Sequence, residues 1–174
     1  MNLPEKCVVD TNVPKTANLP FHASTDHDVP LKCVMACVLA VKHVTTNKCL
    51  IIDEGNEIFD EYRGQLSMRG QPGVGDAFMK WVHDHRYSLP DEQRVKITKS
   101  GDTYDEFPQS AALADFDKAD MKFVAVSNAH KDKPSILQAV DHKWWGWKEA
   151  LADAGITVHF LCPDFTEFKY SKFK

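Results

Sequence analysis

Asp10 is the first residue of the chain that could do chemistry. It follows a short apolar run, residues 7–9, and Thr11 and Asn12 come directly after it. A carboxylate at the carboxyl end of a buried strand lies in the crevice where open α/β sheets bind their ligands. Further carboxylates follow later apolar runs, and carboxylates that converge repel one another unless a cation lies between them. The pattern therefore predicts a hard divalent metal ion and phosphoryl-transfer chemistry.

The second candidate is Glu61, which lies on a helix that the spacing of apolar residues predicts over residues 55–68. It stands next to the stripe of side chains that faces inward, so its carboxylate can reach over the edge of the sheet. Spacing alone does not separate Glu61 from the other acids nearby, which are Asp53, Glu54, Glu57 and Asp60.

The remaining candidates lie where later helices begin. Asp117 and Asp120 are three residues apart at the start of an apolar helix, with Asp115 as a further acid. An aspartate in a first turn also satisfies free N–H groups, so one of the pair can cap the helix. Asp120 is the predicted ligand and Asp117 its support. Asp141 ends a predicted strand and starts a helix, so an N-cap role and a metal-binding role both stay open.

Apolar runs alternate with helical patterns along the chain, which is typical of a parallel sheet with helices on its faces. The polar stretch from Pro14 to Asp28 is predicted to be a loop, with Asp28 as the N-cap of the next helix. The aromatic and basic tail that follows the last predicted strand and ends at Lys174 is compatible with packing against the protein or with a free end. The predicted strands cover 7–10, 48–53, 94–98, 135–140 and 156–161, and the predicted helices begin near 28, 55, 76, 117 and 142.

The order of these segments resembles PIN-domain nucleases, a family of metal-dependent ribonucleases. Residues 8–12 resemble the family's first-strand motif, and residues 58–63 are similar to the helix that carries its glutamate. Residues 117–126 resemble its Asp-x-x-Asp helix start, and residues 138–141 fall where the family has its strand-end aspartate. Family members often have a second aspartate close behind that position, whereas a histidine and a lysine follow here.

The resemblance implies a Rossmann-like three-layer α/β/α sandwich with a central, mostly parallel sheet. It implies a single domain over residues 1–174, in which residues 64–109 are an insert with its own helix and strand. It also implies Mg²⁺ or Mn²⁺ as the cofactor and hydrolysis of single-stranded RNA, with DNA as the alternative substrate. The implied catalytic and metal-binding residues are Asp10, Glu61, Asp120 and Asp141, with Thr11, Asn12 and Asp117 in support.

Two other functions compete with a nuclease. Phosphatases of the haloacid-dehalogenase type also open with a strand-end aspartate, but their chemistry uses Asp-x-Asp, and position 12 is Asn12. The other alternative is a catalytically inactive PIN-like module that binds RNA or protein. A toxin paired with an antitoxin, a free-standing processing nuclease and a homodimer are all compatible with the sequence.

Three tryptophans gather in the helix after the last candidate carboxylate. Trp144 and Trp147 fit one buried helical face, whereas Trp145 lies off that face. Stacking of an unpaired base on Trp145 is therefore an alternative to packing. His142 and Lys143 are candidates for a phosphate contact, and solvated side chains are the ordinary alternative.

Composition limits the choice of partner and compartment. The 174 residues suffice for one domain with a proper core, and the net charge of −4 disfavours broad electrostatic attraction to nucleic acid. Five cysteines without a Cys-x-x-Cys pair predict small buried thiols in a reducing cytoplasm. The polar start shows no apolar leader, and the apolar stretch at 31–41 is too short to span a bilayer. We therefore expect a cytoplasmic protein with no membrane partner.

Overall fold

Two of the candidate carboxylates, Asp10 and Asp141, follow short parallel strands. The computed structural model describes residues 2–19 and 29–173. In it β1 (Cys7–Val9) pairs in parallel with β6 (Ser135–Gln138), and β6 pairs in parallel with β7 (Val158–Phe160). Every residue of β1 is buried, which is the pattern of a parallel strand covered on both faces.

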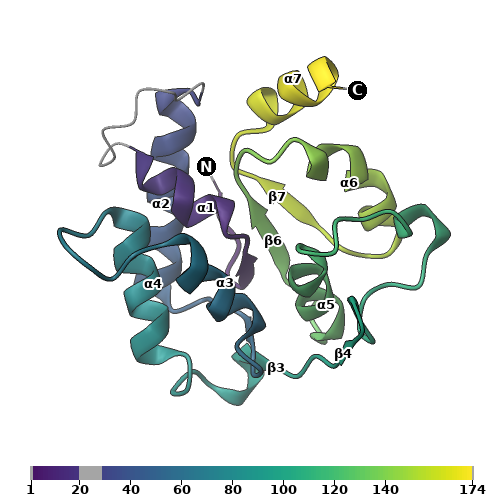
Figure 1. Cartoon of the computed structure of the whole chain (residues 1–174), viewed down its shortest axis with the longest axis horizontal. Coiled ribbons are helices and arrows are strands. Elements are labelled where there is room, and N and C mark those ends of the chain that lie inside the picture. The colour runs from purple at the N-terminus through teal and green to yellow at the C-terminus, as the bar shows by residue number, and fades with distance from the viewer. Residues whose placement is uncertain (1, 20–28, 174) are drawn as a thin grey trace.

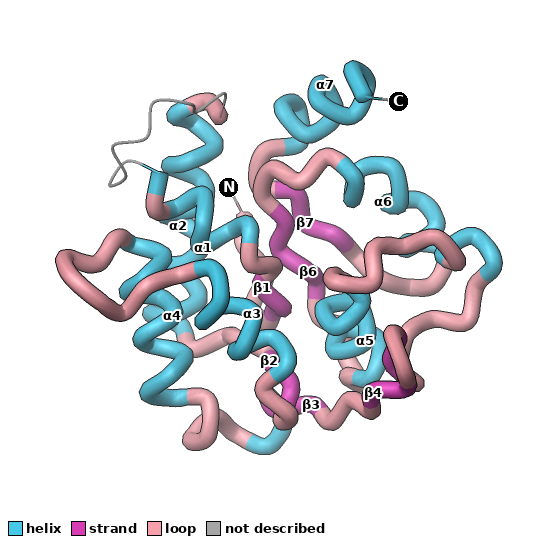
Figure 2. Tube along the Cα trace, in the orientation of Figure 1, coloured by secondary structure: helices cyan, strands magenta, loops and turns pink. Residues whose placement is uncertain are grey.

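A second parallel pair lies on the other side of β1. β2 (Ile52–Asp53) pairs with β3 (Arg94–Val95), and a parallel bridge between Leu50 and Cys7 joins the segment before β2 to β1. The parallel segments therefore follow one another in the order β3, β2, β1, β6, β7 (Figure 2). A separate antiparallel hairpin consists of β4 (Lys99–Ser100) and β5 (Thr103–Tyr104).

Seven α-helices accompany these strands in the described part of the chain. In Figure 1 α1 to α4 gather on the left and α5 to α7 on the right, with β6 between the two groups. α5 packs against β1 and β6, α3 against β2, and α6 against β7. The helices are α1 (Asn12–Ala17), α2 (Leu31–Asn47), α3 (Glu57–Gln65), α4 (Val74–His85), α5 (Met121–Ala129), α6 (Lys143–Asp153) and α7 (Pro163–Phe173).

The mixed α/β class predicted from the sequence is confirmed, and most predicted helices are present with shifted ends. α2 buries Val34, Cys37, Val41 and Val44, which recur at helical spacing. Gly155 lies just after α6 and has a φ of 78°, a left-handed conformation that favours glycine. The predicted strand at 94–98 is wrong beyond its first two residues, because only β3 pairs with a neighbour.

One predicted loop is wrong at its start. Residues from Asn12 to Ala17 form α1, where the sequence predicted polar loop from Pro14 onward. Proline is compatible with the first turn of a helix, where its missing N–H is not needed. The helix is held by burial of Val13, Pro14 and Ala17 and by packing against α2 and α4. The N-cap predicted at Asp28 lies outside the described residues.

The region predicted as an insert contains α4 and β3. α4 packs against α1, α2 and α3, and β3 pairs with β2, so both elements contact the rest of the chain directly. Whether residues 64–109 are an insert relative to other proteins stays a prediction. The tail forms α7, and the Thr166 hydroxyl donates to the Ala139 carbonyl oxygen at 3.2 Å, next to the end of β6.

The prediction that all five cysteines are reduced is wrong for two of them. A disulfide joins Cys33, in the first turn of α2, to Cys162, the residue before α7. The pairing was unreadable from the sequence because the two positions are 129 residues apart and meet only through the fold. Cys7, Cys37 and Cys49 are buried free thiols, as predicted. In the described residues, no helix has the length and apolar character needed to cross a membrane.

Candidate functional site

Asp10 lies at the carboxyl end of β1 and is 1% exposed. Its Oδ1 accepts the backbone N–H of Asn12 at 2.8 Å, in the first turn of α1. Its Oδ2 is buried and has no hydrogen-bond partner in the described structure. A buried carboxylate oxygen without a partner is costly, which indicates that it is reserved for a proton or a cation. The hydroxyl of the buried Tyr62 donates to the Val9 carbonyl oxygen at 2.5 Å, which holds the backbone immediately before Asp10.

Glu61 on α3 faces the same region. Its Oε1 accepts from the Thr11 hydroxyl at 2.5 Å, and its Oε2 forms an ion pair with the Lys122 ammonium group at 2.5 Å. Of the two predicted supporting residues, Thr11 therefore contacts Glu61, and Asn12 contacts Asp10 through its backbone N–H.

The neighbouring acids, which spacing could not separate from Glu61, have other partners. Asp53 accepts the N–H groups of Glu57 and Ile58 at 2.7 and 3.0 Å, so it caps the start of α3. Glu57 accepts from the Tyr104 hydroxyl at 2.8 Å. Asp60 is exposed and pairs with Arg63. The tertiary contacts thus favour Glu61 over these alternatives.

Asp120 and Asp117 take different roles at the start of α5. Asp120 Oδ2 accepts the indole N–H of the buried Trp144 at 3.0 Å. Asp117 accepts the backbone N–H of Ala119 at 3.0 Å and pairs with the Lys143 ammonium group at 3.2 Å. The N–H of Ala119 and the nearby lysine hold the pKa of Asp117 below its ordinary value. Asp117 therefore supports the turn before α5, and its predicted support of a metal ligand stays a prediction.

Asp141 follows β6 and accepts the backbone N–H of Lys143 at 3.0 Å, at the start of α6. It thus has the N-cap role that the sequence left open, and it keeps a second carboxylate oxygen for another partner. Because β1 and β6 are parallel neighbours, Asp10 and Asp141 lie at the same edge of the sheet. We call Asp10, Glu61, Asp117, Asp120 and Asp141 the acidic cluster.

The members of the acidic cluster act on one another electrostatically. Burial, and then the negative charge of Asp120, raises the pKa of Asp10 well above its ordinary value, with Glu61 and Asp141 adding to the effect. Burial and the charge of Asp141 raise the pKa of Asp120 to about 7. Four chain segments that are far apart in sequence therefore bring their carboxylates within electrostatic range of one another.

Lys122 is a site residue that the sequence analysis missed. It is 8% exposed, and besides the Glu61 carboxylate its ammonium group donates to the Ala119 carbonyl oxygen. The signal was present in the sequence: a lysine stands in the first turn of a helix whose other residues are apolar or small. A buried lysine is rare unless it is paired, so it indicates an acid nearby.

The donor set of the cluster fits a hard divalent cation, because it consists of carboxylate oxygens and includes the unpartnered Oδ2 of Asp10. In the described residues, no three or more acidic, histidine or cysteine side chains form a ready cage for a metal ion. Mg²⁺ commonly keeps several waters and takes only one or two carboxylates directly, so such a cage is not required.

Comparisons with known proteins add no assignment. No family model, no curated protein and no solved structure matches this chain. The resemblance to PIN-domain nucleases therefore stays a proposal.

Aromatic side chains back the acidic cluster. Trp144 is buried, as predicted, and packs edge-on against Phe116 with ring centroids 5.3 Å apart. Phe116 also contacts Trp147, at 5.9 Å between centroids. Trp145 packs against Phe160, and the Lys148 ammonium group lies 3.8 Å from the centroid of its ring. Its predicted alternative, stacking of a base, thus competes with two contacts inside the protein.

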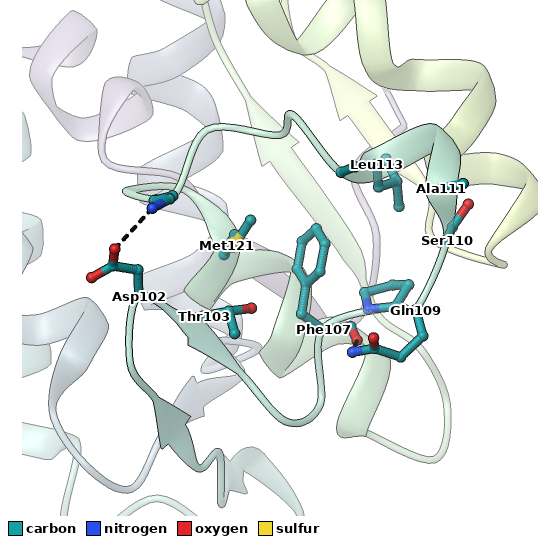
Figure 3. Close-up of a pocket in the computed structure, with 11 residues that line it drawn as sticks. Asp102, Thr103, Phe107, Gln109, Ser110, Ala111, Leu113 and Met121 are labelled. Carbon is teal, nitrogen blue, oxygen red and sulfur yellow. Dashed lines mark hydrogen bonds and ion pairs between the residues drawn. The ribbon is translucent and has the colours of Figure 1, made fainter.

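Two cavities lie beside the segment that carries Asp117 and Asp120. The larger, of about 580 Å³, is bounded by residues 102–121, and the Phe107 ring points into it (Figure 3). Its one lysine, Lys118, is paired with Asp102 at 2.8 Å. The second, of about 510 Å³, we call the aromatic cavity. It is lined by Asp115, Asp117, Lys143, Gly146, Trp147 and Tyr170.

The raised pKa values predict how stability depends on pH in the absence of divalent metal. The folded chain binds a proton on Asp120 up to about pH 7, whereas the unfolded chain releases it near 3.8. Between these values the folded state holds more protons, so its stability falls as the pH rises. We expect the thermal midpoint in chelator to decrease from pH 4 to pH 7, and Asp120→Asn to flatten that slope. A midpoint that rises steadily over this range would contradict the assignment.

The Lys122–Glu61 pair predicts a second effect on stability. Lys122→Met removes the cation that offsets Glu61 inside the cluster. Breaking a fully buried pair costs about 3–5 kcal/mol, and this partly exposed pair should cost about 2 kcal/mol in chelator at pH 8. Lys118→Met is the matched control, because Lys118 and its partner Asp102 are exposed; it should leave the free energy of unfolding nearly unchanged. Urea unfolding measures both, and equal costs would show that Lys122 is an ordinary surface lysine.

Proposed function

We propose that this chain is a metal-dependent nuclease that hydrolyses phosphodiester bonds in single-stranded RNA, built on a Rossmann-like three-layer α/β/α fold. The observation that carries the proposal is the buried, unpartnered Oδ2 of Asp10, together with carboxylates from three other segments that lie within electrostatic range of Asp10. Desolvated carboxylates side by side destabilise a fold unless a proton or a cation joins them. Retaining such a cluster is readily explained by a cation that performs chemistry.

The proposed site divides the work among its residues. Asp10, Glu61, Asp120 and Asp141 would hold Mg²⁺ or Mn²⁺ through oxygen atoms. A bound ion of this kind lowers the pKa of a coordinated water and neutralises charge that develops on the phosphate. The hydroxyl of Thr11 fixes the orientation of Glu61, and the indole N–H of Trp144 fixes that of Asp120.

Two lysines offer positive charge to a substrate at this acidic site. Lys122 forms an ion pair with Glu61 inside the acidic cluster, and Lys143 forms an ion pair with Asp117 at the rim of the cluster. Lys143 is exposed, and the carboxylates around it raise its pKa, so it stays charged and within reach of a phosphate. Local lysines and a metal ion together can offset the net charge of −4 that disfavours broad attraction to nucleic acid.

A catalytically inactive module that binds RNA or protein is the second candidate. The observation that favours it is the Lys122–Glu61 pair, because an ammonium group can serve as the cation that the carboxylates require. The third candidate, a phosphatase of the haloacid-dehalogenase type, lacks the second aspartate at position 12, where Asn12 begins α1. The three differ in what they do to a phosphodiester and to a phosphomonoester.

The test is an activity panel with the purified full chain. Single-stranded RNA, duplex RNA, single-stranded DNA and a small phosphomonoester are each incubated with Mn²⁺, Mg²⁺ or chelator. We expect cleavage of single-stranded RNA with either metal and none in chelator. The products should carry no 2′,3′-cyclic phosphate, because water and not the ribose 2′-hydroxyl is the proposed nucleophile. Products with 2′,3′-cyclic phosphates would indicate a contaminating metal-independent ribonuclease.

Other outcomes select the other candidates. Release of phosphate from the monoester without RNA cleavage would establish the phosphatase. Binding of RNA without cleavage in any divalent ion would establish the inactive module. In that case Lys122→Met, which frees Glu61, is the variant in which to look for recovered metal binding.

A further inference from the structure

The aromatic cavity adjoins the acidic cluster through one shared side chain, Asp117, and through its partner Lys143. Asp117 belongs to both, and Lys143, on its rim, is close enough to Asp120 and Asp141 to be influenced by their charges. The larger cavity at residues 102–121 shows no such link, because none of its lining residues belongs to the acidic cluster. Of these two cavities, the aromatic cavity is therefore the one that adjoins the acidic cluster.

Two aromatic side chains from different helices form the walls of this cavity. Trp147 comes from α6, and its ring is supported from behind by Phe116. Tyr170 comes from α7 and lies against α6 at Gly146, where an added Cβ would be 2.7 Å from the tyrosine ring. A glycine at this position thus lets the tyrosine approach, and the cavity depends on it.

The polar groups of the cavity differ in whether they are already paired. Asp117 and Lys143 bind each other. The carboxylate of Asp115 and the indole N–H of Trp147 make no hydrogen bond or ion pair with the described residues. The cavity therefore offers an aromatic face, a carboxylate acceptor without a partner among the described residues, and a neutral donor.

We propose that the aromatic cavity binds a guanine base of single-stranded RNA, stacked on Trp147 with its N1–H and amino group directed to Asp115. This inference rests on the proposed nuclease function, which supplies the RNA. Single-stranded RNA is recognised by stacking splayed bases on aromatic side chains and by hydrogen bonds to their edges. Guanine offers two adjacent N–H donors, which match the two oxygens of one carboxylate. A carboxylate at this position disfavours a phosphate as the occupant, because both groups are acidic acceptors.

Binding in chelator separates this inference from cleavage. The probes are fluorescein-labelled RNA pentamers, either five uridines or uridines with one central guanosine or inosine, and the readout is fluorescence anisotropy with the full chain. Stacking and edge recognition of one base are worth roughly tenfold in affinity or more. We expect the guanosine pentamer to bind at least about tenfold more tightly than the uridine pentamer, and inosine, which lacks the amino group, to lose most of that gain.

Two variants and one matched control locate the base. Trp147→Leu should remove the preference for guanosine, and Asp115→Asn, at an exposed position, should remove the difference between guanosine and inosine. Trp145→Leu changes another tryptophan of the same helix that lies against Phe160 and outside the cavity. It should leave both preferences unchanged. The thermal midpoint of each variant shows whether it is folded. If Trp147→Leu does not fold, Asp115→Asn still tests the proposal.

Several results would overturn the inference. Equal affinity for the guanosine and uridine pentamers would do so, even where metal-dependent cleavage is observed. Loss of the preference in Trp145→Leu and not in Trp147→Leu would place the base elsewhere. Spermidine binding that depends on Trp147, without a guanosine preference, would show a cation site instead. A guanosine preference without any cleavage would support the cavity while rejecting the proposed hydrolysis.

Discussion

Asp10→Asn is expected to reduce metal-dependent RNA cleavage by more than about 100-fold. Changes to groups that only support a metal ligand commonly cost about 10–100-fold, and Asp10 is the deepest carboxylate of the cluster. The substitution conserves shape and removes one charge. The Asn12 N–H keeps its acceptor, because the amide oxygen can replace Oδ1.

The same variant should not lose stability in chelator, which separates a functional role from a structural one. Burial and neighbouring negative charges raise the pKa of Asp10, so its ionised form is unfavourable in the metal-free fold. We expect the thermal midpoint of Asp10→Asn in chelator at pH 8 to equal or exceed that of the parent chain. The added stability that Mn²⁺ gives the parent by binding its folded state should be absent in the variant.

Asp153→Asn is the matched control for this experiment. Asp153 is exposed at the last residue of α6 and has no ion pair or hydrogen bond in the described structure. It should leave cleavage and the Mn²⁺ effect unchanged. Parent-like cleavage by Asp10→Asn would remove the main support for the nuclease proposal. A variant that is inactive because it is unfolded would make Asp10 a structural residue.

The second large effect concerns the Cys33–Cys162 disulfide. The bridge closes a loop of 129 residues, and the chain-entropy relation assigns such a loop about 5 kcal/mol of stabilisation. The double variant Cys33→Ala/Cys162→Ala should therefore unfold at clearly lower urea concentration. A reducing agent should move the parent to the same curve and leave the double variant unaffected.

Thiol counting tests the bridge itself. The denatured chain should show three reactive thiols before reduction and five after it. Cys37→Ala is the matched control, because Cys37 is a buried free thiol on the same helix; its cost is limited to a small cavity, about 1 kcal/mol. Five reactive thiols in the chain as isolated, or an unchanged midpoint in the double variant, would show that the bridge does not stabilise this protein.

The disulfide also bears on compartment and on the aromatic cavity. Disulfides are rare where thiols are kept reduced, so the bridge does not support the reducing environment that the cysteine pattern predicted. The cytoplasmic location stays a prediction. Cys162 directly precedes α7, the helix that brings Tyr170 to the aromatic cavity. The guanosine preference should therefore be measured with the bridge intact and again after reduction.

Much of the fold followed from patterns that are local in sequence. The apolar run before Asp10 predicted β1, and apolar spacing predicted the helices that carry Glu61 and Asp120. Such patterns work because a helix or strand forms from neighbouring residues with a fixed period. The short helix α1 was missed for the same reason, since only packing against α2 and α4 stabilises it.

What the sequence by itself determined is therefore the set of elements and the candidate acids at their ends. Tertiary structure alone decided that Glu61, and not Asp53, faces Asp10, that Lys122 lies among the acids, and that Cys33 meets Cys162. It also decided that Trp147 lines a cavity while Trp145 packs against the protein. The physical reason is that desolvation, Coulomb energy and covalent bridging depend on distances between segments remote along the chain, which no local period encodes.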